Sequence, residues 1–151
     1  MRFARARLLV ASLAFAAWVG WLGYQALSRG RDYPVLSHSQ FLVSTLDVIA
    51  DVTAGPDGKP SPVVTVREVR WPAAEGHLIG KTITVANLPS DQDFGYRGPG
   101  EYILPLVVGE KSGEHRVAGV PRSPGFEIHA SYIYQLTPAT RQQLEAIPKP
   151  K

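Results

Sequence analysis

The sequence contains no cysteine among its 151 residues. This absence excludes disulfide bonds, a thiol nucleophile, cysteine-ligated zinc, iron–sulfur ligation and lipoprotein-type acylation. A domain exported from the cytoplasm would then depend on its hydrophobic core alone. About 118 residues follow Tyr33, which is enough chain for one such domain.

Recognisable catalytic motifs are also missing. There is no G-x-S-x-G elbow, P-loop, dinucleotide fingerprint or H-E-x-x-H pattern. No two histidines are spaced as metal ligands on one element; the four are His38, His77, His115 and His129. We interpret them as ordinary surface or partly buried histidines and expect no cofactor and no metal. A hydrolase or metal-dependent enzyme whose site is assembled from distant His and Asp/Glu residues remains an alternative.

Two pairs of aspartates could suggest a calcium site or a catalytic carboxylate pair, but the residue pattern fits neither. Asp91 and Asp93 resemble the start of a calcium loop, but tyrosines occupy the sixth and twelfth positions, where glycine and glutamate are needed. We therefore expect an acidic, solvated loop. Asp47 and Asp51 share one face of an expected strand about 13 Å apart, too far for a carboxylate pair. We expect them to mark the solvent face of an outer strand.

A basic stripe for nucleic acid is lacking as well. The chain has a net charge of +3 and a pI near 9.3. Much of the excess comes from five arginines near the N-terminus, which are Arg2, Arg5, Arg7, Arg29 and Arg31. From Tyr33 onward there are eleven basic and twelve acidic residues, a net charge of −1. We therefore expect no nucleic-acid partner.

A long apolar run, Leu8–Leu27, dominates the N-terminal part of the chain. Its twenty uncharged residues would form a helix about 30 Å long, matching the hydrocarbon core of a bilayer. Aromatic and arginine side chains at its ends are typical of membrane interfaces. The residues expected at the interfaces are Arg7, Trp18, Trp21, Tyr24 and Arg29. We predict a single-pass transmembrane signal anchor with a cytoplasmic N-terminus, in contact with the lipid bilayer.

Two other interpretations of this run stay open. A signal peptide cleaved near Ala26–Ser28 would give a secreted protein, although the run is long for a signal peptide and contains Trp18 and Trp21. A buried helix of a soluble fold would show one polar face, which this run does not. Under the favoured interpretation the chain has five parts. These are a basic cytoplasmic arm (1–7), the anchor (8–27), a tether (28–38), an extracytoplasmic β-rich domain (39–148) and a tail (149–151).

Short segments of alternating or β-branched residues, separated by Gly- and Pro-rich loops, indicate a mainly β fold. The expected strands are Leu46–Thr53, Val63–Trp71, Lys81–Leu88 and Glu101–Val108, with weaker candidates at His115–Val120 and Ile128–Leu136. Pro105 predicts an edge or a bulge in the fourth strand. Thr137 and Pro138 predict the N-cap and first position of a short C-terminal helix. We expect a small antiparallel barrel or sandwich of about five or six strands.

The segments VVTVREVRW, KTITVANL and GPGEYILPL follow the first strand in an order that resembles five-stranded OB-type barrels. Among these, the chain looks most like netrin or tissue-inhibitor modules, over roughly Leu46–Val108. The resemblance implies a binding module and transfers no functional residue.

Aromatic residues give the best candidate for a partner-binding surface. Phe94, Tyr96 and Arg97 lie in the longest irregular loop, and Tyr and Arg are enriched at binding hot spots. Three further tyrosines, Tyr102, Tyr132 and Tyr134, are expected to cap the core with their hydroxyls in water. We predict a membrane-tethered, non-catalytic binding domain with a protein or envelope partner. The main alternative is a structural subunit of a membrane complex, and the sequence does not give the oligomeric state.

Overall fold

The computed structural model describes residues 12–24, 35–121 and 131–148. The chain divides into two compact units, Met1–Tyr33 and Pro34–Lys151. In the first unit, residues 12–24 are helical and exposed. The remainder of the expected anchor, 8–11 and 25–27, lies outside the described residues. Among those that are described, no helix combines the length and the hydropathy needed to cross a membrane.

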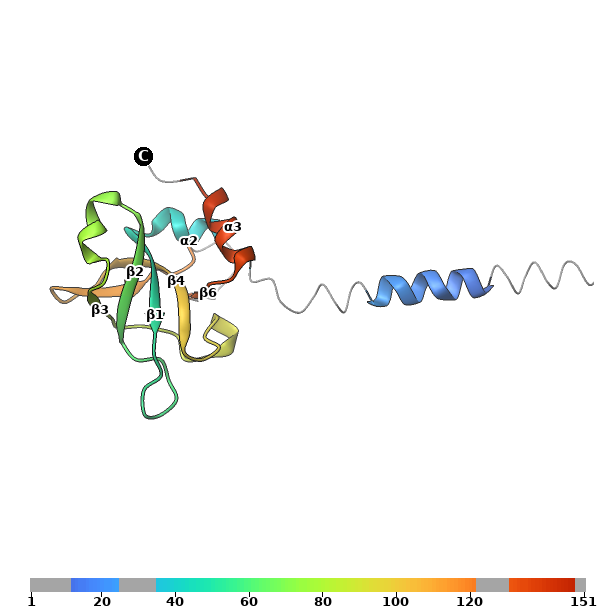
Figure 1. Cartoon of the computed structure of the whole chain (residues 1–151), viewed down its shortest axis with the longest axis horizontal. Coiled ribbons are helices and arrows are strands. Elements are labelled where there is room, and N and C mark those ends of the chain that lie inside the picture. Colours follow the sequence, from blue (N-terminus) through green and yellow to red (C-terminus); the bar gives the residue numbers. More distant parts are fainter. Residues whose placement is uncertain (1–11, 25–34, 122–130, 149–151) are drawn as a thin grey trace, which may run out of the picture. The chain divides into compact units, whose positions relative to one another are not determined.

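The second unit is a closed β-barrel with one extra strand (Figure 1). Its strands are β1 (Leu46–Val52), β2 (Val63–Trp71), β3 (Thr82–Val85), β4 (Gly100–Val108), β5 (Glu114–Val117) and β6 (Tyr134–Gln135). The order is β1-β2-β3-β5-β4, and β1 also pairs with β4, which closes the barrel. Among the strands of the described residues, only the β3–β5 pairing is parallel, and β6 adds to β4. The expected mainly β fold is confirmed, and of the two expected architectures it is the barrel.

The barrel interior is filled by the inward face of each strand. On β1 this face carries the alternating residues that the sequence predicted, beginning at Leu46. The interior cluster consists of Leu46, Val48, Ala50, Val52, Val64, Val66, Ile83, Val85, Tyr96, Tyr102, Leu104, Leu106, Val117 and Ile133. Two short 3-10 helices, η1 (Ala73–Leu78) and η2 (Gln92–Phe94), lie in the connections before and after β3. Leu78 at the end of η1 packs against this core.

A second core lies on the outer face of β1 and β4. Helix α2 (His38–Val43) and helix α3 (Pro138–Ala146) contribute to it (Figure 1). Its buried members are Leu36, Phe41, Ile49, Ile103, Tyr134, Leu144 and Ile147. The expectation that Asp47 marks a solvent face is therefore wrong, because Asp47 is 1% exposed. β1 pairs with a strand on each side and is buried on both faces, so it is a central strand.

Helix α3 begins as the sequence predicted. The Thr137 hydroxyl accepts a hydrogen bond from the Thr140 amide at 3.1 Å, and the Thr137 amide donates to the Thr140 hydroxyl at 2.8 Å. This reciprocal cap satisfies amide groups that the first turn would leave unpaired. Leu144 and Ile147, at the C-terminal end of the helix, are buried.

The expectation for Pro105 is wrong. β4 is a central strand, and its register with β1 runs from Gly100 to Leu106 without a shift. On its other edge β4 pairs with β5 beyond Pro105 and with β6 before it. The Pro105 carbonyl accepts a hydrogen bond from the Ala118 amide at 2.8 Å. Pro105 has no N–H to return that bond, and the Ala118 carbonyl accepts from the Gln40 side chain at 2.7 Å.

Two of the three tyrosines also differ from expectation, because their hydroxyls are bonded inside the protein. The Tyr102 hydroxyl donates to the Gly98 carbonyl at 2.7 Å. The Tyr134 hydroxyl donates to the Gln40 side-chain oxygen at 2.7 Å and accepts from the Ser37 amide at 3.0 Å. Burial raises the pKa of Tyr134 to about 12, so this hydroxyl stays protonated near neutral pH and ties α2 to β6.

Candidate functional site

Two irregularities in the β1–β2 ladder decide which side chains reach the outer face of the barrel. Ile49 lies opposite Glu68 and Ala50 lies opposite Val66, so Arg67 has no residue opposite it. The register shifts again between Asp47 and Val48, and there Arg70 is the unmatched residue of β2. A bulge redirects side chains locally. Here both unmatched residues are arginines that bind aspartates of β1.

Arg70 joins three elements on the helix-covered side of the barrel. Its guanidinium lies 3.4 Å from the Asp47 carboxylate and also donates to the Ile147 carbonyl, at the C-terminal end of α3. The other Asp47 oxygen accepts a hydrogen bond from the Ser44 hydroxyl at 2.5 Å, directly after α2. The Arg70 and Asp47 side chains are only 9% and 1% exposed. The network therefore links α2, β1, β2 and α3 through one buried ion pair.

Burial governs the ionisation of Asp47. It raises the pKa of the Asp47 carboxyl above the usual 3.8, whereas the Ser44 hydrogen bond and Arg70 act in the opposite direction. Removing water from around a carboxylate disfavours its charged form. The carboxylate thus depends on Ser44 and Arg70 to remain ionised inside the fold.

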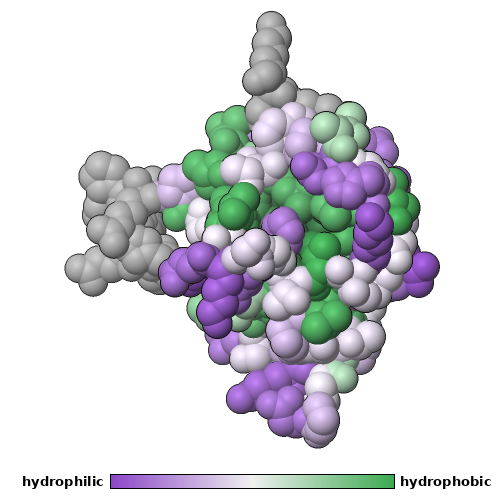
Figure 2. All heavy atoms as spheres, turned by 90° about the vertical axis from the view of Figure 1, so that its left-hand side faces the viewer, coloured by the Kyte–Doolittle hydropathy of each residue, from purple (hydrophilic) through white to green (hydrophobic). Residues whose placement is uncertain are grey.

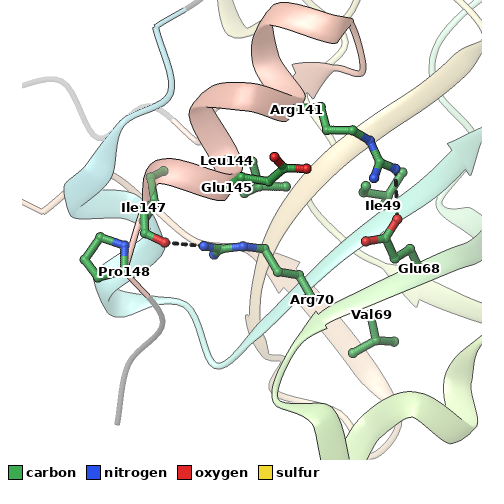
Figure 3. A pocket seen from close by; sticks show the side chains of 9 residues that line it. All are labelled: Ile49, Glu68, Val69, Arg70, Arg141, Leu144, Glu145, Ile147 and Pro148. Carbon is green, nitrogen blue, oxygen red and sulfur yellow. Dashed lines mark hydrogen bonds and ion pairs between the residues drawn. The ribbon is translucent and has the colours of Figure 1, made fainter.

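A pocket of about 380 Å³ opens beside this network, between α3 and the β1–β2 ribbon (Figure 3). Its apolar lining comes from Ile49, Val69, Leu144, Ile147 and Pro148. Charged groups surround the pocket. Arg141 of α3 is bonded to Glu68 of β2 at 2.9 Å, and the Arg70 guanidinium points toward the Ile147 carbonyl (Figure 3). This volume lies at the small end of the range typical of ligand pockets.

Glu145 is the one charged side chain of this pocket that forms no hydrogen bond or ion pair with the described part of the chain. Its carboxylate lies between the Arg70 and Arg141 side chains in Figure 3. The pocket offers an apolar surface, fixed charges and one unpaired carboxylate. These groups suit the binding of a partner that has both apolar and charged parts. Over residues 12–24, 35–121 and 131–148, no cluster of three or more His, Asp or Glu side chains could hold a metal ion.

The loop residues predicted to bind a partner lie elsewhere, near β4 and the segment before β6. Phe94 is half-buried and its ring lies 5.8 Å from that of Tyr132. Tyr96 is 5% exposed and stacks on Tyr102 with ring centres 6.0 Å apart. Arg97 is exposed, and its amide donates to the Tyr102 hydroxyl at 3.0 Å. Of the three predicted residues, Phe94 and Arg97 present surface to a partner, and their binding role stays a prediction.

Side chains near the parallel β3–β5 pair form another candidate surface. Val63 lies opposite Thr84 of β3, Val108 lies opposite His115 of β5, and both valines are exposed. The His115 Nδ1 atom is buried without a hydrogen-bond partner in the described residues, and burial lowers the pKa of this imidazole. Figure 2 looks onto the side of the barrel where β3 lies, and its hydrophobic groups are interrupted by hydrophilic ones. This surface is not a continuous apolar patch.

Three of the five predicted membrane-interface residues are described. Trp18, Trp21 and Tyr24 lie on the N-terminal helix and are 59%, 58% and 67% exposed. The Trp21 and Tyr24 rings lie 6.5 Å apart, one helical turn along. Arg7 and Arg29 lie outside the described residues, so their placement stays a prediction.

Arg70, Arg141, Glu145 and the pocket between them were not predicted from the sequence. One signal was present in the sequence. The inward valines of β2 change phase, from the even positions Val64 and Val66 to Val69, and such a change indicates a bulge. No comparable signal places α3 beside β2, because that contact joins residues more than seventy positions apart.

Comparisons with protein families, with curated proteins and with solved structures find no match for this chain.

Proposed function

We propose that this protein is a membrane-tethered, extracytoplasmic binding domain that catalyses no reaction itself. The observation that carries the proposal is an uncharged segment of twenty residues, Leu8–Leu27, flanked by arginines and joined by a short tether to a folded barrel. Such a segment is long enough to anchor the chain in a bilayer. The more basic N-terminal flank favours a cytoplasmic N-terminus.

The strand order supports an OB-type barrel as the binding scaffold. A five-stranded barrel in which strand 1 pairs with strands 2 and 4, and strand 3 runs parallel to strand 5, has the arrangement expected of that fold. In OB folds the surface of strands 2 and 3 often binds oligonucleotides. Here the facing pairs of those strands are Val63 with Thr84 and Thr65 with Thr82. These outward-facing pairs carry no charge, which supports a partner other than nucleic acid.

The pocket beside α3 is the place where we expect a protein or envelope component to bind. It combines buried apolar side chains with charged groups at its opening, as binding sites commonly do. It also lies on regular elements held by the Asp47–Arg70 network, so its shape is fixed before a partner arrives.

The test begins with topology. Protease added outside intact cells or spheroplasts should digest the domain, while mass spectrometry of the membrane-bound remainder finds an intact Met1 end. A soluble product that starts near Arg29 would instead identify a cleaved signal peptide and would refute the tether.

The binding site is tested by crosslinking of the membrane-bound chain, followed by identification of neighbours. Arg141→Ala and Glu145→Ala should each reduce the yield of the specific crosslinked partner, because both side chains line the pocket from exposed positions on α3. Gln142→Ala is the matched control, since Gln142 is exposed on the same helix and does not line the pocket. Equal yields from all three variants would exclude the pocket as the binding site.

A second candidate is a structural subunit of a membrane complex. It is favoured by the aromatic side chains of the N-terminal helix, of which Trp18 and Trp21 are both more than half exposed. Replacing both with leucine should then dissociate the complex in mild detergent, as sedimentation would show. A monomer for both the native chain and the variant would exclude this candidate.

A further inference from the structure

Exposed apolar side chains are concentrated where the chain enters the barrel domain. In the described part of the second unit, six large hydrophobic side chains are exposed, and Val35, Leu42 and Val43 account for half of them. Their exposed fractions are 79%, 59% and 45%. Neighbouring Leu36 and Phe41 are buried in the second core, so the segment is anchored on one side and open on the other.

The same segment carries no charge that would keep it in water. Residues 35–46 contain no Asp, Glu, Lys or Arg, and His38 is their only titratable side chain. Buried hydrogen bonds fix the segment to the barrel, because the Gln40 side chain donates to the carbonyls of Ala118 and Tyr132 at 2.7 and 2.9 Å. The exposed side chains of α2 are therefore held outward by a rigid support.

The length of the tether decides what can cover this surface. If the anchor ends at Leu27, the eight peptide units to Val35 reach at most about 29 Å when fully extended. A compact unit of this size is about 35 Å across. The tether is thus too short to pass around the domain and place its opposite end on the bilayer. A tether of this length favours contact between the bilayer and the side that carries Val35 over contact with the opposite end.

We propose that Val35, Leu42 and Val43 form a membrane-contact surface that rests on the bilayer holding the anchor. The inference rests on the proposed tether. The free energy falls when exposed Leu and Val side chains move from water into the boundary between headgroups and acyl chains. Residues 35–46 themselves carry no acidic side chain that anionic headgroups would repel. Contact of this kind would fix the orientation of the barrel and leave the β1–β2 loop pointing away from the membrane.

The lack of cysteine makes a site-specific test straightforward. Leu42→Cys and Asp57→Cys each introduce a single thiol for an environment-sensitive fluorophore. Asp57 is the matched control, because it is exposed in the loop at the opposite end of β1 from α2. The full chain is placed in nanodiscs of phosphatidylcholine and phosphatidylglycerol with one chain per disc, which removes a second copy as the covering partner.

Retention of the chain in the discs after alkaline washing tests the tether by itself. With the tether intact, we expect a blue-shifted emission and quenching by nitroxide-labelled lipids for the probe at position 42, and neither effect at position 57. Retention with a water-like spectrum at position 42, or with equal quenching at both positions, would overturn the contact surface while the tether stands. Loss of the chain from the discs would overturn both.

Discussion

β1 and β2 share two aspartate–arginine pairs that differ mainly in what surrounds them. Asp47–Arg70 lies at the end covered by α2 and α3, with side chains 1% and 9% exposed. Asp51–Arg67 lies toward the β1–β2 loop, with side chains 26% and 60% exposed. Both arginines occupy unmatched positions of the same strand. The same pair of residue types is therefore a buried junction at one end of the ribbon and a solvated contact at the other.

The Asp47–Arg70 pair, called the covered pair below, is buried because helices α2 and α3 cover it. Its position in the strand ladder is not the cause, because both arginines occupy unmatched positions. A buried charge that loses its partner stays in a medium of low dielectric constant, whereas water replaces the partner of an exposed charge. Arg70 of the covered pair also donates a hydrogen bond to the Ile147 carbonyl at the C-terminal end of α3. Its loss should disturb the pocket as well as the strands.

The largest effect is expected for Asp47→Ala. It should lower the free energy of unfolding by about 3–5 kcal/mol, because Arg70 would remain buried without its counter-charge. Chemical denaturation of the full chain in detergent measures the loss. The double variant Asp47→Leu with Arg70→Met removes both charges and should recover most of the stability. A loss of unfolding free energy below about 1 kcal/mol in Asp47→Ala would mean that the covered pair contributes no more than an exposed ion pair such as Asp51–Arg67.

A change of pH is expected to have a smaller effect on the free energy of unfolding, and this effect again comes from Asp47 of the covered pair. The pKa of Asp47 is raised by burial, so the folded chain takes up this proton at a higher pH than the unfolded chain. The resulting contribution to stability is fully present below pH 3.8 and is lost as the pH rises through the folded-state pKa. The unfolding free energy of the native chain minus that of Asp47→Asn should therefore fall with rising pH. A difference that rises instead would show that Arg70 holds the pKa below 3.8.

Thr137→Ala should have a moderate effect on stability, and this effect should be concentrated in α3, which covers the Asp47–Arg70 pair. Loss of the reciprocal cap with Thr140 should cost about 1 kcal/mol and loosen the start of α3. Hydrogen exchange should then be faster in α3 and unchanged in the β1–β2 loop. Gln142→Ala, an exposed change within α3, serves as the control. Unchanged exchange in α3 would show that packing of Leu144 and Ile147 holds the helix without its cap.

The smallest effect is expected for Asp51→Ala. Because this pair is largely in water, its removal should cost less than about 1 kcal/mol, and less still at high salt. Thermal unfolding at low and high ionic strength measures both quantities. A loss as large as that of Asp47→Ala would refute the view that helix cover separates the two pairs.

Local features of the barrel domain could be predicted from the sequence. Alternation placed β1 and β4 within a residue or two, β-branched residues placed β2 at its observed bounds, and Thr137–Pro138 placed the start of α3. These signals are local, because a strand face repeats every two residues and a cap acts within one turn. The weaker expected strand at Ile128–Leu136 is realised only as Tyr134–Gln135, and its residues 128–130 lie outside the described part.

The predictions that were wrong concern the segments that tertiary packing places against each strand or side chain. Asp47 was expected in water because alternation cannot show that α2 and α3 cover the outer face of β1. Pro105 was expected at an edge because the sequence does not show that β5 and β6 divide one side of β4 between them. The hydroxyls of Tyr102 and Tyr134 were expected in water because their acceptors come from other segments.

The sequence by itself determined the β-rich class of this protein, most strand positions, the cap of α3, the near-neutral charge of the domain and the composition of its N-terminal segment. Each of these depends on the residues of one short stretch. Only the tertiary structure decided that Arg70 reaches Asp47, that α3 forms a pocket with β2, and that Leu42 is exposed while Phe41 is buried. Such contacts join residues far apart in the chain, and the packing of the whole domain selects them.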